Sequence, residues 1–471
     1  MQSHDLRLNG ILSSERLVPQ KDAFAPVSPG PCKLTLPFMA NYHWKWRSRR
    51  IRRPRAMKHV NITLERDKHV VEAVVRRFGP ISRARIHELT DIRGGTTSLL
   101  VRGLIEEGRL VECGRSNNAL GRKQILLKLN EEYRYVAGID FDDEDVVAGV
   151  MDLRPSLRAV VKKPTRLAAG RDALIRQLIA SVRAVLAKAS LTPESLLGIG
   201  IADPGLVDSR RGVTIMSSMI DFWREVPLRE IFEKEFGVPA VVETRTRAKA
   251  VAERQLGAGE MSENMIYVDY GSGIGAGIIL DGKLLYGHKY SAGEFGHTHL
   301  STDGVVCKCG SFGCLEAVAG ARAMEMKIRR VISEGGYSRA LEMAGGDLSR
   351  INGWTVLEAA VAGDKASSNI VAEIGSYLGL GLANLVNLFN PSVVLLDHRL
   401  ALAGDSVLHH IVQVMRRQAL TYATDDVAVR FATLGSEAGV LGIGLLILNR
   451  HYEIPALKPP RFLIEPEVAR A

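Results

Sequence analysis

A short stretch at residues 293–316, GEFGHTHLSTDGVVCKCGSFGCLE, constrains the fold of this chain more than any other segment. It combines nitrogen and sulfur side chains that bind zinc with glycines that allow tight turns. The candidate ligands are His297, Cys307, Cys309 and Cys314, and on spacing alone His299 could replace His297. Four such ligands complete a tetrahedron and leave no position for a substrate, so the stretch predicts a structural Zn2+. The alternative is a set of reduced thiols beside surface histidines.

The pattern ExGHx(9)CxCGxxGCxE in this stretch resembles the signature of the ROK family (repressors, open reading frames and sugar kinases). The matching positions are Glu294, His297, Cys307, Cys309, Cys314 and Glu316. The resemblance extends over about residues 60–450 and is to the repressor branch of the family. It selects His297 over His299 as the nitrogen ligand. It also implies that Glu294, His297 and Glu316 hold the hydroxyl groups of a sugar effector.

The length and charge of the chain limit what it can be. A chain of 471 residues is too long for one hydrophobic core, so we expect two or three domains. The net charge of +10 is concentrated in residues 1–60 and 61–128, whereas the remainder is mildly acidic, which confines contact with a polyanion to the N-terminal part. No apolar run approaches the roughly 18 residues that cross a bilayer. Five cysteines, three of them in the zinc stretch, indicate the reducing cytoplasm.

Residues 1–60 show no helical or strand periodicity. They contain several prolines and end in a basic cluster, HWKWRSRRIRRPRAMKH. This composition predicts a disordered N-terminal extension, or a gene start placed too early with Met57 as the true initiator. An arm that contacts DNA phosphates is the functional alternative.

Residues 61–128 predict a winged helix-turn-helix. An apolar stripe at residues 70–75 marks the first helix, Gly79-Pro80 ends it, and Ser82 caps a second helix. A third helix should span 96–107, with Leu99, Leu100, Leu104 and Ile105 turned inward, and two strands near 110–112 and 124–127 should form a wing. The expected DNA contacts are Arg83, Thr96, Thr97, Ser98, Arg102, Arg122 and Lys123. A small protein-interaction module is the alternative.

Buried strands alternate with helices from residue 129 to 455, and 456–471 form a tail. The strands fall at 136–140, 146–152, 197–202, 238–243, 265–270, 278–280 and 393–396, and long helices fall at 173–187, 366–388 and 440–448. The resemblance implies that these elements form a two-lobed α/β domain with the actin-like, ribonuclease-H-like fold.

Three elements of the family's kinase chemistry are missing. Its first phosphate loop has the form DxGGT, but residues 140–145 here read DFDDED, whose carboxylates repel phosphate. The aspartate that acts as base is replaced by Arg245, which cannot accept a proton. A glycine pair near the nucleotide is replaced by Asp397-His398. We therefore expect no enzymatic activity; an active sugar kinase with a DNA-binding appendage is the alternative.

Arg245 is expected to project into the cleft that corresponds to the active site of the family's kinases, near Glu294 and Glu316. It would form an ion pair with one of them, or clamp the carboxylate or phosphate of an anionic sugar derivative. The expected partners are double-stranded operator DNA, a sugar or anionic sugar derivative, and a second copy in a homodimer or dimer of dimers. A scaffold whose effector lobe binds a protein is a further alternative.

Overall fold

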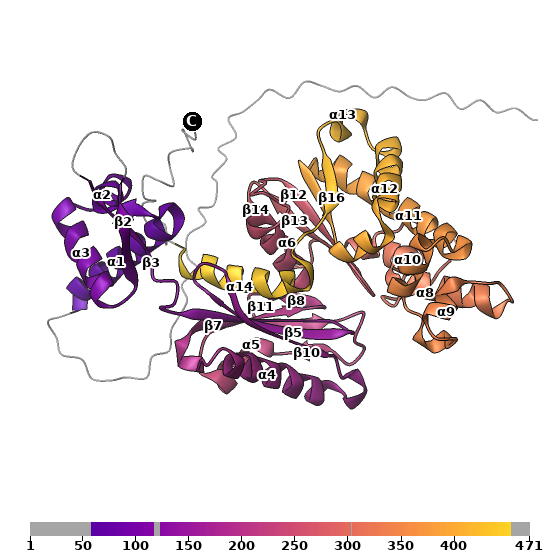
Figure 1. Ribbon diagram of the computed structural model, residues 1–471, viewed down its shortest axis with the longest axis horizontal. Coiled ribbons are helices and arrows are strands. Elements are labelled where there is room, and N and C mark those ends of the chain that lie inside the picture. The colour runs from indigo at the N-terminus through magenta and orange to yellow at the C-terminus, as the bar shows by residue number, and fades with distance from the viewer. Residues whose placement is uncertain (1–57, 117–122, 303, 454–471) are drawn as a thin grey trace, which may run out of the picture. The chain divides into compact units, whose positions relative to one another are not determined.

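The computed structural model describes residues 58–116, 123–302 and 304–453 (Figure 1). The N-terminal extension predicted for residues 1–60 lies outside the described residues up to position 57. The tail predicted for residues 456–471 lies outside them as well.

Residues 58–129 contain three helices and a small antiparallel sheet. The helices are α1 (Lys58–Phe78), α2 (Arg83–Thr90) and α3 (Gly94–Glu106), and the strands are β1 (Ile81–Ser82), β2 (Leu110–Arg115) and β3 (Ile125–Leu129). The sheet order is β1-β3-β2. As predicted, Ser82 caps α2, because its side chain accepts a hydrogen bond from Arg85 N at 3.3 Å. Val74, Ile86, Leu104 and Leu127 pack together in the core between these elements.

The inward face of α3 differs from the prediction. The helix begins at Gly94, and its buried residues are Thr97, Leu100, Val101 and Leu104. Leu99 lies outside this stripe and is 60% exposed, so its predicted inward orientation is wrong. Residues three and four apart share a helix face, and Leu99 is out of phase with Leu100 and Leu104.

The first lobe is a five-stranded sheet in the order β11-β7-β4-β5-β6. Its strands are β4 (Tyr135–Phe141), β5 (Asp145–Asp152), β6 (Leu157–Pro164), β7 (Leu196–Asp203) and β11 (Ala240–Thr244). The first three pair antiparallel, and β7 and β11 run parallel to β4. Helix α4 (Arg171–Lys188) covers one face and α14 (Ala438–His451) covers the other (Figure 1), so the strands are buried on both sides.

The second lobe repeats this topology in the order β14-β13-β12-β15-β16. Its strands are β12 (Met265–Tyr270), β13 (Ile274–Leu280), β14 (Lys283–Leu284), β15 (Val393–Leu396) and β16 (Ala428–Phe431). The predicted turn at Asp281-Gly282 joins β13 to β14, with positive φ at both residues (49° and 71°). Two such lobes confirm the predicted actin-like fold.

Helices fill the space around the two sheets. They are α5 (Leu228–Phe236), α6 (Arg245–Leu256), α7 (Leu315–Ala319), α8 (Ala321–Ser333), α9 (Arg339–Met343), α10 (Gly353–Val361), α11 (Lys365–Phe389), α12 (Asp405–Gln418) and α13 (Thr421–Thr424), and a small sheet is built from β8 (Leu206–Asp208), β9 (Val213–Met216) and β10 (Arg224–Val226). Among the described helices, α11 alone is long and apolar enough to cross a membrane, but 61% of its apolar window is buried. It packs against α10 and α12 as a core helix of the second lobe.

Helix α14 contacts parts of the chain that are distant in sequence. It packs closely on α6, where a Cβ on Gly442 would lie 1.7 Å from the carbonyl oxygen of Ala248. At its C-terminal end it meets α1: Arg76 Nη2 donates to Asn449 Oδ1 at 3.0 Å, and the Arg76 guanidinium lies 5.0 Å from the centre of the Tyr452 ring. One helix therefore touches both the first lobe and the N-terminal helices.

Candidate metal centre and effector cleft

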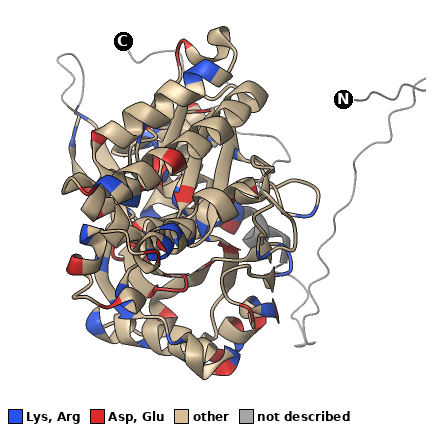
Figure 2. Cartoon of the chain, turned by 90° about the vertical axis from the view of Figure 1, so that its right-hand side faces the viewer, with Lys and Arg blue, Asp and Glu red and all other residues tan. Residues whose placement is uncertain are grey.

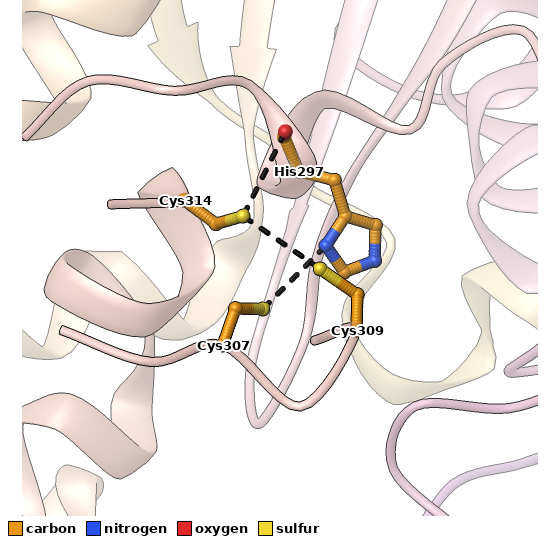
Figure 3. Close-up of side chains that lie close together, drawn as sticks. All are labelled: His297, Cys307, Cys309 and Cys314. Atoms are coloured by element: carbon orange, nitrogen blue, oxygen red, sulfur yellow. Dashed lines mark hydrogen bonds between the residues drawn. The ribbon is translucent and has the colours of Figure 1, made fainter. Parts of the chain in front are cut away.

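The structure brings together the four side chains that the sequence predicts as metal ligands (Figure 3). His297 ends a 3-10 turn (Phe295–His297), Cys307 and Cys309 lie on the following loop, and Cys314 precedes α7. Positive φ values at Gly310 and Gly313 (90° and 64°) fold the loop back on itself. Tight backbone turns therefore place ligands up to 17 positions apart in sequence next to one another.

The spacing of these four ligand atoms fits a tetrahedral metal ion. All four lie within 4.8 Å of one another. Cys309 Sγ is 3.8 Å from Cys314 Sγ, and Cys307 Sγ is 3.7 Å from His297 Nδ1. The edge of a tetrahedron with Zn–S bonds of about 2.3 Å is about 3.8 Å long. His299 is not part of the cluster; its Nδ1 lies 2.8 Å from the carbonyl oxygen of Phe312.

A cleft of about 300 Å3 adjoins the cluster and is lined by both lobes. Glu294, His297, Glu316 and Arg245, the residues predicted to bind an effector, all line it. Glu316 is half-buried and its Oε2 accepts a hydrogen bond from Ile274 N at 3.0 Å, whereas Glu294 is exposed. Met219 lines the same cavity from the first lobe. The predicted residues are thus gathered in one place, although Arg245 faces different partners from those expected.

The predicted pairing of Arg245 with Glu294 or Glu316 is wrong. Its Nη1 donates to Asp142 Oδ2 at 2.7 Å, and its Nε donates to Asp140 Oδ1 at 3.1 Å. Arg245 starts α6 directly after β11, and the two aspartates stand at the end of β4 in the same sheet. Its side chain is only 11% exposed, and its guanidinium forms ion pairs with these two carboxylates.

Two further cations extend this ion pair into the second lobe. Lys249 Nζ lies 2.7 Å from Asp269 Oδ1 and 3.2 Å from Asp397 Oδ2, and its side chain is buried. Arg399 Nε donates to Asp397 Oδ1 at 3.0 Å. The Arg399 guanidinium also stacks 4.7 Å from the centre of the Trp354 ring, and Trp354 Nε1 donates to Glu144 at 3.0 Å. A continuous network of charges therefore joins β4 to β12 and β15.

Burial and ion pairing compete in setting the pKa values of this network. Burial alone would raise the pKa of Asp142, but the Arg245 guanidinium outweighs it and the pKa lies well below its usual range. For Asp397, burial is likewise outweighed by Lys249 and then Arg399, and the pKa is again lowered. The two carboxylates remain ionised at neutral pH, and the cations that hold them are unavailable to other anions.

The other basic residues of α6 also have internal partners. Arg247 pairs with Glu243 at 2.7 Å and donates to the carbonyl oxygen of Tyr290 at 3.0 Å. Arg247 lines the same cleft as Glu294 and Glu316, whereas the partners of Lys249 are Asp269 and Asp397. The residues that the sequence reasoning missed are Asp269, Trp354 and Arg399. The sequence did contain one signal for part of the network. Relative to the family pattern, carboxylates replace glycines in the loop at 140–145 and a cation replaces the base at Arg245, and such paired changes of opposite charge indicate an ion pair.

The predicted DNA contacts fall into four groups. Thr96, Ser98 and Arg102 are exposed on α3, and Lys123 is exposed beside β3. Arg83 is half-buried and pairs with Glu112 at 3.0 Å, whereas Arg122 lies outside the described residues. Thr97 is fully buried and its hydroxyl donates to the carbonyl oxygen of Ile92 at 3.1 Å. Thr97 therefore supports the helix from inside and cannot reach a base edge.

Comparison with known proteins places this fold and site in a family. The chain is 29% identical to the xylose repressor of Caldicellulosiruptor bescii over 375 residues, which cover 80% of this chain and 93% of that protein. It is 35% identical to the glucokinase of Halalkalibacterium halodurans over 256 residues, or 54% of this chain and 76% of the glucokinase.

The solved structure of a ROK family transcriptional regulator, a homolog of the Escherichia coli Mlc protein, matches with a TM-score of 0.69. It is 25% identical, and the match covers 83% of this chain and 97% of the regulator. The model of the ROK family itself matches residues 136–450. That match takes in both lobes, the charge network and all four members of the His/Cys cluster. The chain belongs to the ROK family.

Proposed function

We propose that this chain is a DNA-binding transcriptional repressor whose sugar-kinase-like domain senses an effector and does not transfer phosphate. The observation that carries the proposal is the ion pair of Arg245 with Asp140 and Asp142, which occupies the positions where a ROK kinase needs a base and its first phosphate loop. The similarity to a xylose repressor also extends over more of the chain than the similarity to a glucokinase. A regulator of this kind acts in the cytoplasm, where its DNA is.

We assign DNA binding to residues 61–128 as a winged helix-turn-helix, followed by the ROK domain at 129–455 and a tail at 456–471. Helix α3 would enter the major groove with Thr96, Ser98 and Arg102, and the β2–β3 hairpin would lie against the DNA backbone through Lys123 and its sequence neighbour Arg122. The exposure of Leu99 on the same face of α3 supports this, because an apolar side chain can contact a thymine methyl group.

Replacing Arg102 with alanine should weaken operator binding by about 5- to 150-fold, the effect of losing one base or phosphate contact. Thr97→Ala should instead lower the melting temperature and leave the preferred sequence unchanged, because the Thr97 hydroxyl bonds only inside the protein. Fluorescence anisotropy with an operator duplex at two salt concentrations measures the DNA affinity of both variants, and thermal melting measures their stability. Arg176→Ala, an exposed arginine on α4, is the charge-matched control. Equal binding by the Arg102 and Arg176 variants would contradict the assignment of α3.

We propose that His297, Cys307, Cys309 and Cys314 hold a structural Zn2+. Three thiolates and one imidazole are a common ligand set for structural zinc, and a set of four protein ligands leaves no open position for a substrate. Bound metal would hold the turn at residues 295–297 against the start of α7 and so contribute to folding, not to a reaction.

The cleft next to the cluster is the proposed effector site, with Glu294, His297 and Glu316 as its polar groups. Arg245 was expected to clamp an anion, but it is already paired with Asp140 and Asp142. The two glutamates are suited to accept hydrogen bonds from sugar hydroxyls. We therefore propose a neutral sugar as the effector, and the similarity to a xylose repressor makes xylose the first to test.

An active sugar kinase with a DNA-binding appendage is the second candidate, favoured by the 35% identity to a glucokinase. Thermal melting separates the two. Under our proposal a neutral sugar raises the melting temperature and Mg-ATP does not. Glu316→Gln abolishes the sugar effect, whereas Glu334→Gln, directly after α8, retains it. Stabilisation by Mg-ATP together with formation of a sugar phosphate would establish the kinase instead.

A further inference from the structure

A second cavity lies beside the effector cleft. Its volume is about 480 Å3, which is within the range of about 300–1,000 Å3 for small-molecule pockets. It is formed by the loop that carries Cys307, by α7 and α8, and by the middle of α11. We call this cavity the α8 pocket. Its lining includes Val305, Val306, Arg322, Met326 and Tyr377.

The α8 pocket and the effector cleft share a wall. The residues that line both cavities are Ser218, Met219, Ser272 and Glu316. Met219 and Glu316 come from opposite lobes and lie against the same glycine. A Cβ on Gly273 would be 3.1 Å from Glu316 Oε2 and 3.2 Å from Met219 Sδ. Methionine side chains are unbranched and flexible, so a rotation of Met219 would join the two cavities.

The α8 pocket exposes apolar side chains. Met326 is 66% exposed, Val306 is 64% exposed and Val305 is 40% exposed. Apolar side chains gathered around one cavity are suited to bury an apolar group of a ligand. Met326 and Tyr377 favour an aromatic ring in particular, because thioether sulfur and aromatic side chains both make favourable contacts with rings.

One cation of the α8 pocket is left without a counter-charge. The other three form ion pairs: Lys308 with Asp221, Lys327 with Glu373 and Arg330 with Glu334. Arg322 is exposed, and no hydrogen bond or ion pair joins it to another side chain in the part of the chain that the structure describes. A free guanidinium can lie over the face of an aromatic ring. Figure 2 shows Lys and Arg interspersed with Asp and Glu among the described residues of this side of the molecule, which does not suit a polyanion such as nucleic acid.

We propose that the effector is an aryl glycoside, a neutral sugar joined through its anomeric oxygen to an aromatic ring, and that the α8 pocket binds the ring. The inference rests on the proposed function, because the sugar occupies the cleft at Glu294, His297 and Glu316 and only the ring enters the α8 pocket. Glu316 holds the sugar at the shared wall. Arg322 and Met326 are four residues apart on α8 and so present one face of the helix to the ring. A free monosaccharide fills the cleft alone.

Calorimetric titration of the full-length protein with xylose, methyl xyloside and phenyl xyloside tests the proposal, with both anomers of each glycoside. The phenyl glycoside should bind at least about 10-fold more tightly than the methyl glycoside of the same anomer, because its ring buries apolar surface. Met326→Glu should reduce this difference to less than about 2-fold, because it places a charge against the ring. Arg322→Gln should weaken binding of the phenyl glycoside as well. Met343→Glu, at a methionine 44% exposed on α9, is the matched control and should retain the full difference.

Equal affinity for the phenyl and methyl glycosides, no binding of the phenyl glycoside, or a preference that Met326→Glu retains would overturn the inference. Free xylose distinguishes this failure from failure of the proposed function. Binding of xylose that Glu316→Gln abolishes would leave a neutral sugar as the effector, with the α8 pocket unused. Operator binding tests the repressor assignment separately, because it needs no sugar.

Discussion

Cys309→Ser should lose the bound metal entirely and lower the melting temperature of the second lobe by more than any surface substitution. The ion would join the turn at residues 295–297 to the start of α7, and both segments carry core residues. Phe295 and Leu315 are buried there, and a Cβ on Gly381 of α11 would lie 2.6 Å from the Phe295 ring. Loss of a structural metal site costs more than about 4 kcal/mol, which shifts the melting temperature by about 10 °C or more.

Elemental analysis and thermal melting measure this together. Cys113→Ser is the matched control, because Cys113 is an exposed cysteine on β2 outside the cluster. It should retain one metal ion per chain and the wild-type melting temperature. Full metal content in the Cys309 variant, or equal loss in both variants, would remove Cys309 from the ligand set.

Removing Arg245 should have the second large effect. Arg245→Ala leaves Asp140 and Asp142 as buried carboxylates without their main counter-charge, which costs about 3–5 kcal/mol or roughly 6–20 °C of melting temperature. Arg176→Ala on α4 should stay near the wild type. The triple variant Asp140→Asn/Asp142→Asn/Arg245→Met removes both signs of charge and should recover most of the loss, because a neutral pocket has no unpaired charge.

The pH dependence of the Arg245 variant gives an independent check. In the wild type the pKa of Asp142 is depressed, so its stabilisation is present above the unfolded value, about 3.9, and is lost only as the pH falls below it. Without Arg245 the effect of burial prevails and raises the carboxylate pKa, so the penalty is largest at neutral pH and is relieved by protonation. The difference in free energy of unfolding between the variant and the wild type should therefore become smaller from pH 7 to pH 5. A gap that widens on acidification would contradict the network.

The sequence predicted the elements of this fold better than it predicted the contacts between them. The strands 265–270 and 393–396 were placed correctly, because short buried runs flanked by glycine or polar residues define their own ends; the flanking residues are Asn264 and Gly271, and Ser392 and Asp397. The four predicted metal ligands were also correctly grouped, because a loop with several glycines can bring nearby residues together whatever the rest of the fold does. The partners of Arg245 were missed because Asp140 lies 105 positions away in the chain. They become neighbours only through the order β11-β7-β4 of the sheet.

Thr97 was misassigned for a local reason. Thr97 lies three residues before Leu100 and seven before Leu104, so at 3.6 residues per turn it shares the buried face of α3 with them. Thr97 was predicted to contact a base edge, but it is a buried residue whose hydroxyl is hydrogen-bonded inside the protein. Its neighbours Thr96 and Ser98 keep the exposure that DNA contact requires.

The contacts of α14 have a consequence for how far apart the two proposed DNA-binding parts of a dimer can be. Residues 58–129 are joined to the ROK domain by the chain after β3, and they are held again where Arg76 meets Asn449 and Tyr452. Because residues 58–129 are held at two points, they can rotate only about the line between those points. Their independent motion relative to the ROK domain is therefore restricted. In a dimer this would fix the distance between the two α3 helices. Operators whose half-site spacing is changed by a few base pairs should therefore bind more weakly. Insertion of base pairs between half-sites would therefore measure the stiffness of this second attachment.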